Sequence, residues 1–286
     1  MSLTHDFEYF KPKTLNEALD FLAQFGSKAK ILAGGTDLIL RIKEGFETPD
    51  ALIDVKGIKE LNRIELVDNV LFIGANITFS ELIESEIIKD NFHLLWESSK
   101  TVASVGTRNR ATITGNICSA VPSLDSGPAL LVYNAEVLVK NSKGERKISI
   151  HDWFIAPKKT AIKSDEMVIG LLIHKHGKKN GTCYMKLGRY TGEDLAQAGV
   201  GILVSEENEY RIAFCAVGPI PKRFTKIEAL LNGKTLNGEL IKEAQLLALS
   251  EISPITDIRA TKEYRNHMIQ VMIERGLKTS IERLNK

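Results

Sequence analysis

Short apolar segments separated by polar or glycine-bearing turns run through all 286 residues, and this pattern constrains the fold most strongly. No apolar run approaches the length that a membrane-spanning helix needs, so the sequence predicts no membrane span. With 43% hydrophobic residues the chain can still bury a substantial core. Helix-length and strand-length segments alternate without a detectable internal repeat, which predicts an α+β fold in three parts.

The first part, residues 1–55, is expected to be a small α/β unit. Thr14 to Glu17 has the pattern of a capping box, and apolar residues then recur at helical spacing until Gly26. "AKILA" predicts a buried strand, "LILRIKE" a short helix and "ALIDV" a second strand. Between the first strand and the short helix lies the loop Gly34-Gly35-Thr36-Asp37.

The second part, residues 56–165, opens with two strands around Asp68-Asn69 and a helix after a capping box at Thr78 to Glu81. The segment 105–127, "VGTRNRATITGNICSAVPSLDSG", is rich in glycine, threonine and proline and is expected to be irregular. A loop of that length within a domain is usually functional or disordered. A helix from Pro128 and a hairpin turning at Lys143-Gly144 complete this part.

The third part, residues 166–286, is expected to combine an antiparallel sheet with a bundle of helices. Four strands with short connections are predicted from "EMVIGLLIHK", "TCYMKLG", "AGVGILV" and "YRIAFCAVG". Three helices follow, the first opened by a capping box at Thr225 to Glu228 and the last running from about residue 260 to the end.

The distribution of charge and the first ten residues exclude several classes of protein. Lys and Arg number 38, Asp and Glu number 36, and the net charge of +2 is scattered, so no footprint for nucleic acid or an anionic membrane is present. Small molecules and protein partners are the expected ligands. The first ten residues show no basic region followed by an apolar one, and we therefore expect a cytoplasmic protein without a signal peptide.

Metal sites are not predicted. Cys118, Cys183 and Cys215 are far apart and form no CxxC pair, whereas zinc and iron–sulfur sites need clustered thiolates. His174 and His176 share one face of a strand and could chelate a metal, but no nearby ligand completes the set. We expect a surface pair instead. No side-chain pattern predicts a catalytic residue.

Two familiar phosphate-binding motifs are absent. Gly199-Val200-Gly201 lacks the third glycine of a dinucleotide fingerprint and continues as a strand. Gly233-Lys234-Thr235 resembles the end of a P-loop, but Glu228 occupies the position of the first required glycine. The end of a helix at Gly233 is the better interpretation.

Two other loops remain, and the residues alone leave their role open. Ala33 to Asp37 and Thr112 to Asn116 each carry glycine and hydroxyl groups beside apolar segments, and Asp125 follows the second. Such a loop can bind an anion through main-chain N–H groups where the missing Cβ of glycine allows close approach. Each could equally be an ordinary turn without a ligand.

Taken together, these segments resemble the FAD-binding medium subunit of the molybdenum hydroxylase family, which includes xanthine dehydrogenase, carbon monoxide dehydrogenase, nicotinate dehydrogenase and 4-hydroxybenzoyl-CoA reductase. "ILAGGTDLIL" is similar to the first FAD loop of that family and "ATITGNICSAVPSLDSGPALL" to the second. "YMKLGRYTGEDLAQAGVGI" is similar to the start of its C-terminal module. The resemblance covers essentially the whole chain.

The resemblance implies a two-part FAD-binding domain of the vanillyl-alcohol-oxidase (PCMH) type, followed by an antiparallel sheet with a helical bundle. It implies that the first loop and the second hold the FAD pyrophosphate from two sides. Asp125 would hold a ribitol or ribose hydroxyl, Val168 would lie near the adenine, and Lys186 and Tyr190 would lie near the flavin ring. The implied cofactor-binding residues are Ile31, Leu32, Ala33, Gly34, Gly35, Thr36, Asp37, Leu38, Val102, Thr112, Ile113, Thr114, Gly115, Asn116, Asp125, Val168, Lys186 and Tyr190.

This sequence departs from the family pattern at two positions. Thr114 stands where the family usually has the first of two glycines, so its backbone must tolerate the conformation of the loop or shift. Val121 replaces the acidic residue that commonly precedes the proline at Pro122. Gly34, Gly35 and Asp125 are retained, so FAD remains the expected cofactor.

The function implied by the resemblance is electron transfer. In the family, a molybdopterin subunit transforms the substrate, an iron–sulfur subunit carries electrons on two [2Fe-2S] clusters, and the flavin subunit passes them to an acceptor such as NAD. The scattered cysteines fit a chain that holds only the flavin. Two alternatives stay open: a stand-alone flavin oxidoreductase of the same fold, and an assembly subunit without FAD.

Overall fold

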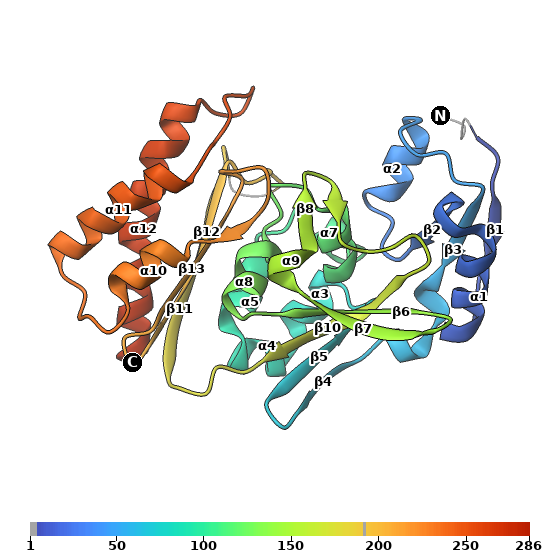
Figure 1. The fold of residues 1–286 in the computed structure, drawn as a ribbon, viewed down its shortest axis with the longest axis horizontal. Coiled ribbons are helices and arrows are strands. Elements are labelled where there is room, and N and C mark those ends of the chain that lie inside the picture. The colour runs from blue at the N-terminus through green and yellow to red at the C-terminus, as the bar shows by residue number, and fades with distance from the viewer. Residues whose placement is uncertain (1–4, 191–192) are drawn as a thin grey trace.

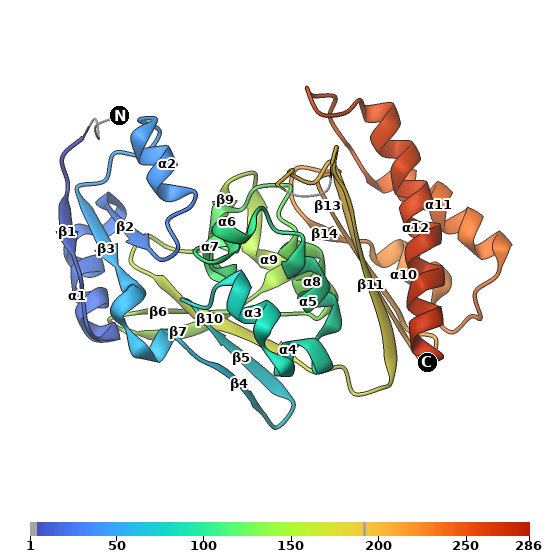
Figure 2. The same cartoon turned by 180° about the vertical axis from the view of Figure 1, so that it is seen from behind.

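The computed structural model describes residues 5–190 and 193–286, which form three parts arranged in a row (Figures 1 and 2). The N-terminal part lies at one end, the middle part carries the longest run of short helices, and the C-terminal part lies at the other end. Each part has its own sheet, and a small two-stranded hairpin belongs to the middle. None of the helices in the described ranges is long and apolar enough to cross a membrane.

The N-terminal part is a three-stranded parallel sheet with helices in the connections. Its strand order is β1-β3-β2. Because all three strands are parallel, their connections must cross over: α1 lies between β1 and β2 along the chain, and α2 lies between β2 and β3. The elements are β1 (Glu8–Phe10), α1 (Leu15–Phe25), η1 (Gly26–Lys28), β2 (Ala29–Leu32), α2 (Leu38–Lys43), β3 (Ala51–Asp54), η2 (Val55–Gly57) and η3 (Lys59–Leu61).

The middle part is a five-stranded antiparallel sheet, in the order β4-β5-β10-β6-β7, covered on one face by short helices. Its strands are β4 (Ile64–Val67), β5 (Val70–Gly74), β6 (Glu136–Asn141), β7 (Gly144–Ser149) and β10 (Met167–His174), with the hairpin β8 (Phe154–Ala156) and β9 (Lys159–Thr160). Its helices are α3 (Phe79–Glu84), α4 (Glu86–Asn91), α5 (His93–Lys100), α6 (Val105–Arg108), α7 (Ile113–Ser119), α8 (Ser126–Val132) and α9 (Ile150–Trp153).

The strand β10 lies at the centre of this middle sheet, so its assignment to the C-terminal sheet was wrong. It pairs with β5 on one side and with β6 on the other. Val168 packs into the helix-covered core, whereas Ile169 packs into the core shared with the N-terminal part. Burial on both faces explains the continuous apolar run of this strand. We propose that the third part begins after β10 rather than at residue 166.

The polar segment 105–127 was expected to be irregular, and this expectation was wrong. It forms α6, α7 and the start of α8. Ser104 caps α6 by accepting from Thr107 N at 3.3 Å, and Thr112 caps α7 by accepting from Gly115 N at 3.0 Å. The threonines and glycine therefore favour helix starts. Ile113 and Ile117 are fully buried, and this burial outweighs the low helix propensity of the segment.

The C-terminal part is a four-stranded antiparallel sheet with a helical bundle on one face (Figure 1). The strand order is β11-β12-β13-β14, and α12 packs along β11 and β12. The opposite face of the sheet contacts α5 and α8 of the middle part. The elements are β11 (Asn180–Leu187), β12 (Ala198–Ser205), β13 (Tyr210–Cys215), β14 (Lys222–Arg223), α10 (Thr225–Leu231), α11 (Gly238–Glu251) and α12 (Lys262–Leu284).

Of the three predicted capping boxes, only the one at Thr78 and Glu81 is complete. Thr14 accepts from the N–H of Glu17, but the Glu17 carboxylate accepts from the N–H of Lys13 instead of closing the box. The box at Thr225 does not form, because α10 already begins at that residue. Its expected acid, Glu228, instead accepts from the N–H of Ile212 in the sheet at 2.7 Å.

Candidate cofactor-binding site

The first candidate loop connects β2 to α2 and touches the main chain of the second. Gly35 has φ +76°, a conformation that favours glycine. A Cβ on Gly34 would lie 2.1 Å from the carbonyl oxygen of Arg110 and 2.9 Å from the Cα of Ala111. Only glycine at position 34 therefore lets the two segments approach this closely. Both views show this loop facing α7 (Figures 1 and 2).

This loop also presents unused hydrogen-bond donors. In the described part of the chain, the main-chain N–H groups of Gly34, Gly35, Thr36 and Asp37 donate to no protein acceptor. Thr36 and Asp37 are exposed. Consecutive free N–H groups at a helix start carry partial positive charge and bind anions. The loop thus has the donors of an anion site without a basic side chain in its sequence.

The second candidate segment is the first turn of α7. Thr112 accepts from the N–H of Gly115, and the N–H of Asn116 bonds the carbonyl of Thr112 at 3.0 Å. The N–H of Ile113 donates to Ile77 O at 3.3 Å, while that of Thr114 has no protein acceptor within the described ranges. The Asn116 side chain accepts from the hydroxyl of Ser126 at 2.7 Å, which ties α7 to α8.

Thr114 fits its position without a left-handed backbone. It lies in the first turn of α7 and is absent from the residues of positive φ in the described part of the chain. Its side chain is buried, and its hydroxyl donates to the carbonyl of Ala75 at 2.5 Å. The conformation that seemed to demand glycine here is therefore an ordinary helical one. Val121 is partly buried and packs against the core of the middle part.

A side-chain hydrogen bond also joins the two segments. The hydroxyl of Ser119, at the end of α7, donates to the Asp37 carboxylate at 2.5 Å. Together with the contact between Gly34 and Arg110, this bond connects the N-terminal part to the middle part at two points. The first candidate loop therefore lies against α7 and against the residues that precede it.

Asp125 lies between the middle and C-terminal parts, at the start of α8. Its carboxylate is buried and accepts from the Lys186 ammonium at 2.9 Å and from the Tyr184 hydroxyl at 2.8 Å. Lys186 also donates to the carbonyl of Thr101 at 2.8 Å. Burial raises the pKa of Asp125, and the two donors on β11 offset part of that rise.

The remaining candidate residues make fewer contacts with the two loops and with Asp125. Val102 is buried next to Thr101, and its carbonyl accepts from the Arg108 guanidinium at 2.8 Å. Val168 is buried in the core of the middle part, on β10. Tyr190 is 61% exposed on the connection between β11 and β12. The side chains next to the first loop belong to, or pack against, the hydrophobic clusters of the N-terminal part; they are Ile31, Leu32, Ala33 and Leu38.

Two contact residues were missed by the sequence reasoning. Tyr184 donates to Asp125, and Ser119 donates to Asp37. Side chains alternate between the two faces of a strand, so Tyr184, two residues before Lys186, was expected on the same face of β11 and could have been predicted. No sequence signal distinguishes Ser119 from other serines.

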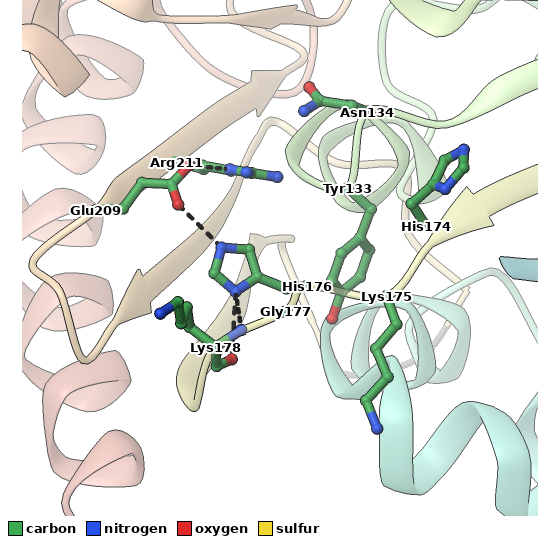
Figure 3. Close-up of a pocket in the computed structure, with 9 residues that line it drawn as sticks. All are labelled: Tyr133, Asn134, His174, Lys175, His176, Gly177, Lys178, Glu209 and Arg211. Atoms are coloured by element: carbon green, nitrogen blue, oxygen red, sulfur yellow. Dashed lines mark hydrogen bonds and ion pairs between the residues drawn. The ribbon is translucent and has the colours of Figure 1, made fainter. Parts of the chain in front are cut away.

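His174 and His176 line a cavity of about 330 Å³ between the middle and C-terminal parts (Figure 3). They are not the expected surface pair, because the His176 side chain is only 6% exposed, whereas that of His174 is 62% exposed. The His176 imidazole points to Glu209 at 2.9 Å, whereas the His174 ring points away from it. Glu209 also accepts from Arg211 at 2.6 Å, so its carboxylate has both an imidazole and a guanidinium as partners. Among the described residues no group of three potential ligands could hold a metal ion.

Comparisons with known proteins define the class to which this fold and site belong. Residues 5–173 match the family described as the FAD binding domain in molybdopterin dehydrogenase, and residues 182–280 match the CO dehydrogenase flavoprotein C-terminal domain. The break between the two matches lies after β10. The chain belongs to this family, as an FAD-binding subunit of the molybdenum hydroxylases.

Relatives match along nearly their full length. The carbon monoxide dehydrogenase medium chain of Hydrogenophaga pseudoflava is 31% identical over 95% of this chain and 96% of its own. The xanthine dehydrogenase FAD-binding subunit of Escherichia coli O157:H7 is 28% identical over 96% and 95%. A solved carbon monoxide dehydrogenase structure from Hydrogenophaga pseudoflava superimposes with a TM-score of 0.94, at 31% identity and 99% coverage of both chains.

The residues present fit FAD, the cofactor of this family. A pyrophosphate is an anion, and the free N–H groups of Gly34 to Asp37 and of Thr114 are the donors that bind anions without a basic side chain. A Cβ on Gly34 would occupy the close contact that brings the first loop against the residues preceding α7. The fit therefore rests on main-chain geometry that this sequence provides.

Proposed function

We propose that this chain is the electron-transfer subunit of a molybdenum hydroxylase complex, and that it passes electrons from [2Fe-2S] clusters of a partner through FAD to an acceptor such as NAD. The observation that carries the proposal is the close main-chain contact of Gly34 with Arg110, which sets the loop with free N–H groups at residues 34–37 against the residues that precede α7. Full-length matches to medium and FAD-binding subunits support it.

The proposal assigns the iron–sulfur clusters and the molybdopterin to two partner subunits. Cys118, Cys183 and Cys215 are far apart in the sequence, whereas an iron–sulfur cluster needs clustered thiolates. Cys183 and Cys215 are buried, and burial raises the pKa of Cys183 to about 11, which disfavours the thiolate that would bind a metal. These side chains suit a structural role.

In this proposal the chain holds and orients FAD. The N–H groups of 34–37 and of Thr114 bind the pyrophosphate, and Asp125 accepts a hydroxyl of the ribitol or ribose. Lys186, which donates to Asp125 and to Thr101 O, offsets part of the rise that burial causes in the pKa of that carboxylate. The proposed contacts of the apolar side chains come from Ile31, Leu32, Ala33, Leu38, Val102, Ile113, Val168 and Tyr190.

Bound FAD supplies the redox chemistry, because a flavin exchanges electrons singly with iron–sulfur clusters and in pairs with an acceptor such as NAD. The side chains of this chain need not transfer protons. Their work is to bind the cofactor, to orient it and to exclude water around it. The substrate of the complex is then chosen on the partner that holds the molybdopterin.

Reverse electron flow tests the proposal without knowledge of the substrate. The complex, assembled from this chain and its iron–sulfur and molybdopterin partners, is treated with NADH under anaerobic conditions. We expect the flavin absorbance to bleach and the electron paramagnetic resonance signals of reduced [2Fe-2S] clusters to appear, the latter only when FAD-loaded chain is present. Equal cluster reduction without this chain would contradict the proposal.

The same preparation separates the two alternatives. A stand-alone flavin oxidoreductase would turn over a substrate as the isolated chain, without either partner. An assembly subunit would remain colourless and would take up no FAD on titration. Bleaching by another donor but not by NADH would retain the electron-transfer role and replace NAD as the acceptor.

A further inference from the structure

Two side chains of the C-terminal sheet, Tyr184 and Lys186, donate hydrogen bonds to the Asp125 carboxylate. Tyr184 and Lys186 lie two residues apart on β11, so both side chains project from the same face. The Tyr184 hydroxyl donates to Oδ1 of Asp125, and the Lys186 ammonium donates to Oδ2. Each carboxylate oxygen thus has one protein donor and keeps acceptor capacity for another.

The Tyr184 hydroxyl has two polar neighbours, Asp125 and Cys215. The side chain is buried, and besides Asp125 the hydroxyl contacts the Cys215 sulfur at 3.9 Å. A thiol is a weak hydrogen-bond partner, whereas a bond from a hydroxyl to a carboxylate is charge-assisted and short. The hydroxyl therefore fixes the direction in which Oδ1 of Asp125 can accept a second bond.

The strand that carries Tyr184 is itself held by helices on both sides. The N–H of Tyr184 donates to the Glu97 carboxylate of α5 at 2.8 Å. Arg283 of α12 binds both oxygens of the same carboxylate, at 3.0 and 2.6 Å, and also Thr182 O at 2.6 Å. The position of the Tyr184 hydroxyl is therefore set by the packing of the C-terminal part onto α5.

We propose that Tyr184 is a positioning residue for the cofactor: its hydroxyl orients the Asp125 carboxylate as an acceptor for an FAD hydroxyl, so that cofactor retention depends on the C-terminal sheet. This inference rests on the proposed role of Asp125 in holding FAD. It assigns to the C-terminal part an action on a residue that lies within the matched FAD-binding domain.

A positioning role has a signature in pH that a purely structural role lacks. The groups that face Asp125 are Tyr184 and Lys186 of β11, with Cys215 of β13 behind the tyrosine. The carboxylate accepts a hydroxyl best when it is ionised, that is, above its pKa. Burial already raises the pKa of Asp125, and loss of the Tyr184 hydroxyl raises this pKa further. On acidification, the Asp125 carboxylate without the Tyr184 hydroxyl is therefore protonated, and stops accepting the FAD hydroxyl, at a higher pH than in the wild type.

The test compares Tyr184→Phe with Tyr210→Phe in the full chain. Tyr210 is the matched control, because it is also buried in the same sheet and its hydroxyl donates to Lys234 O at 2.9 Å rather than to Asp125. FAD affinity is measured by flavin fluorescence titration from acidic to mildly alkaline pH. We expect Tyr184→Phe to weaken FAD about tenfold at neutral pH, the range of a hydrogen bond to a charged group, and the control to match the wild type.

Two further measurements distinguish a positioning role of Tyr184 from a folding defect. The weakening on acidification should begin at a higher pH in Tyr184→Phe than in the wild type. In an Asp125→Ala background, Tyr184→Phe should cause no additional loss of FAD, and any folding defect common to both backgrounds cancels in this cycle.

Identical affinity and pH profile for Tyr184→Phe and the wild type would overturn the inference, as would an equal loss in the Asp125→Ala background. A wild-type chain that binds no FAD at any pH would overturn the proposed function instead. The two failures are therefore distinguishable.

Discussion

Gly34 lies so close to Arg110 that a Cβ on residue 34 would be 2.1 Å from the Arg110 carbonyl oxygen. This contact brings the loop after β2 against the residues that precede α7, and it crosses from the N-terminal part to the middle part. The loop that follows β2 has free main-chain N–H groups at residues 34–37, and the first turn of α7 has one at Thr114. The site is built by backbone approach, so small changes in side-chain volume should disturb it.

Gly34→Ala should abolish stable FAD retention. The added methyl group meets main-chain atoms that cannot move aside as a side chain would, and overpacking of this kind costs about 1–3 kcal/mol of unfolding free energy. Gly238→Ala is the matched control, because a Cβ there meets nothing within 4 Å. Flavin content after gel filtration and the thermal midpoint check both variants. Full FAD retention in Gly34→Ala would mean that the close contact is not needed.

Thr114→Gly, which restores the residue usual in the family, should weaken the fold without improving FAD binding. The Thr114 hydroxyl bonds the buried carbonyl of Ala75, and its loss should cost about 1–3 kcal/mol of unfolding free energy. Thr114→Ser keeps the hydroxyl and should lose less. Urea denaturation and FAD titration provide the two measurements. Tighter FAD binding in Thr114→Gly would show that the threonine strains the site.

Acidification should remove a stabilising contribution of Asp257. Burial alone would raise the pKa of Asp257, but the N–H groups of Arg259 and Ala260 and the Arg265 guanidinium hold it at about 2, below its usual 3.8. A depressed pKa contributes stability above the unfolded value that is lost as the pH falls through the folded value. The window is therefore about pH 4 to 2, and because solvent screens this partly exposed carboxylate, the contribution is about 1 kcal/mol.

Asp257→Asn tests this contribution. The variant should be less stable than the wild type at neutral pH, because the buried Arg265 loses its carboxylate partner at 2.8 Å. Its stability should also fall less steeply between pH 4 and 2. Asp50→Asn, at a more exposed ion pair with Lys28, serves as the control and should change stability little. Parallel pH profiles for Asp257→Asn and the wild type would contradict the account.

The sequence predicted individual helices and strands better than it predicted which strands pair in each sheet. The hairpin at Asp68-Asn69 was predicted correctly, since both residues have positive φ and adjoin β4 and β5. Strand β10 was placed in the wrong sheet because its neighbours β5 and β6 are distant in sequence, and short connections do not reveal such pairing. The helix α7 was missed because its stability comes from buried isoleucines and a threonine cap rather than from propensity.

The same limit applies to the candidate site. Gly34, Gly35 and Asp125 could be proposed as site residues from local pattern and resemblance, and their role stays a prediction. The contacts of Tyr184 with Asp125 and of Ser119 with Asp37 depend on how separate parts pack. Thr114 seemed out of place in a loop, and it becomes ordinary once the segment is known to be a helix.

A titration of the wild-type chain with FAD and with riboflavin tests the central claim most directly. If main-chain donors of the two segments bind the pyrophosphate, FAD should bind at one per chain, and riboflavin, which lacks the pyrophosphate, should bind at least about a hundredfold more weakly, since two charge-assisted bonds are lost. Fluorescence quenching of the two flavins gives both constants. Equal affinity for FAD and riboflavin, or no uptake of FAD, would contradict this account.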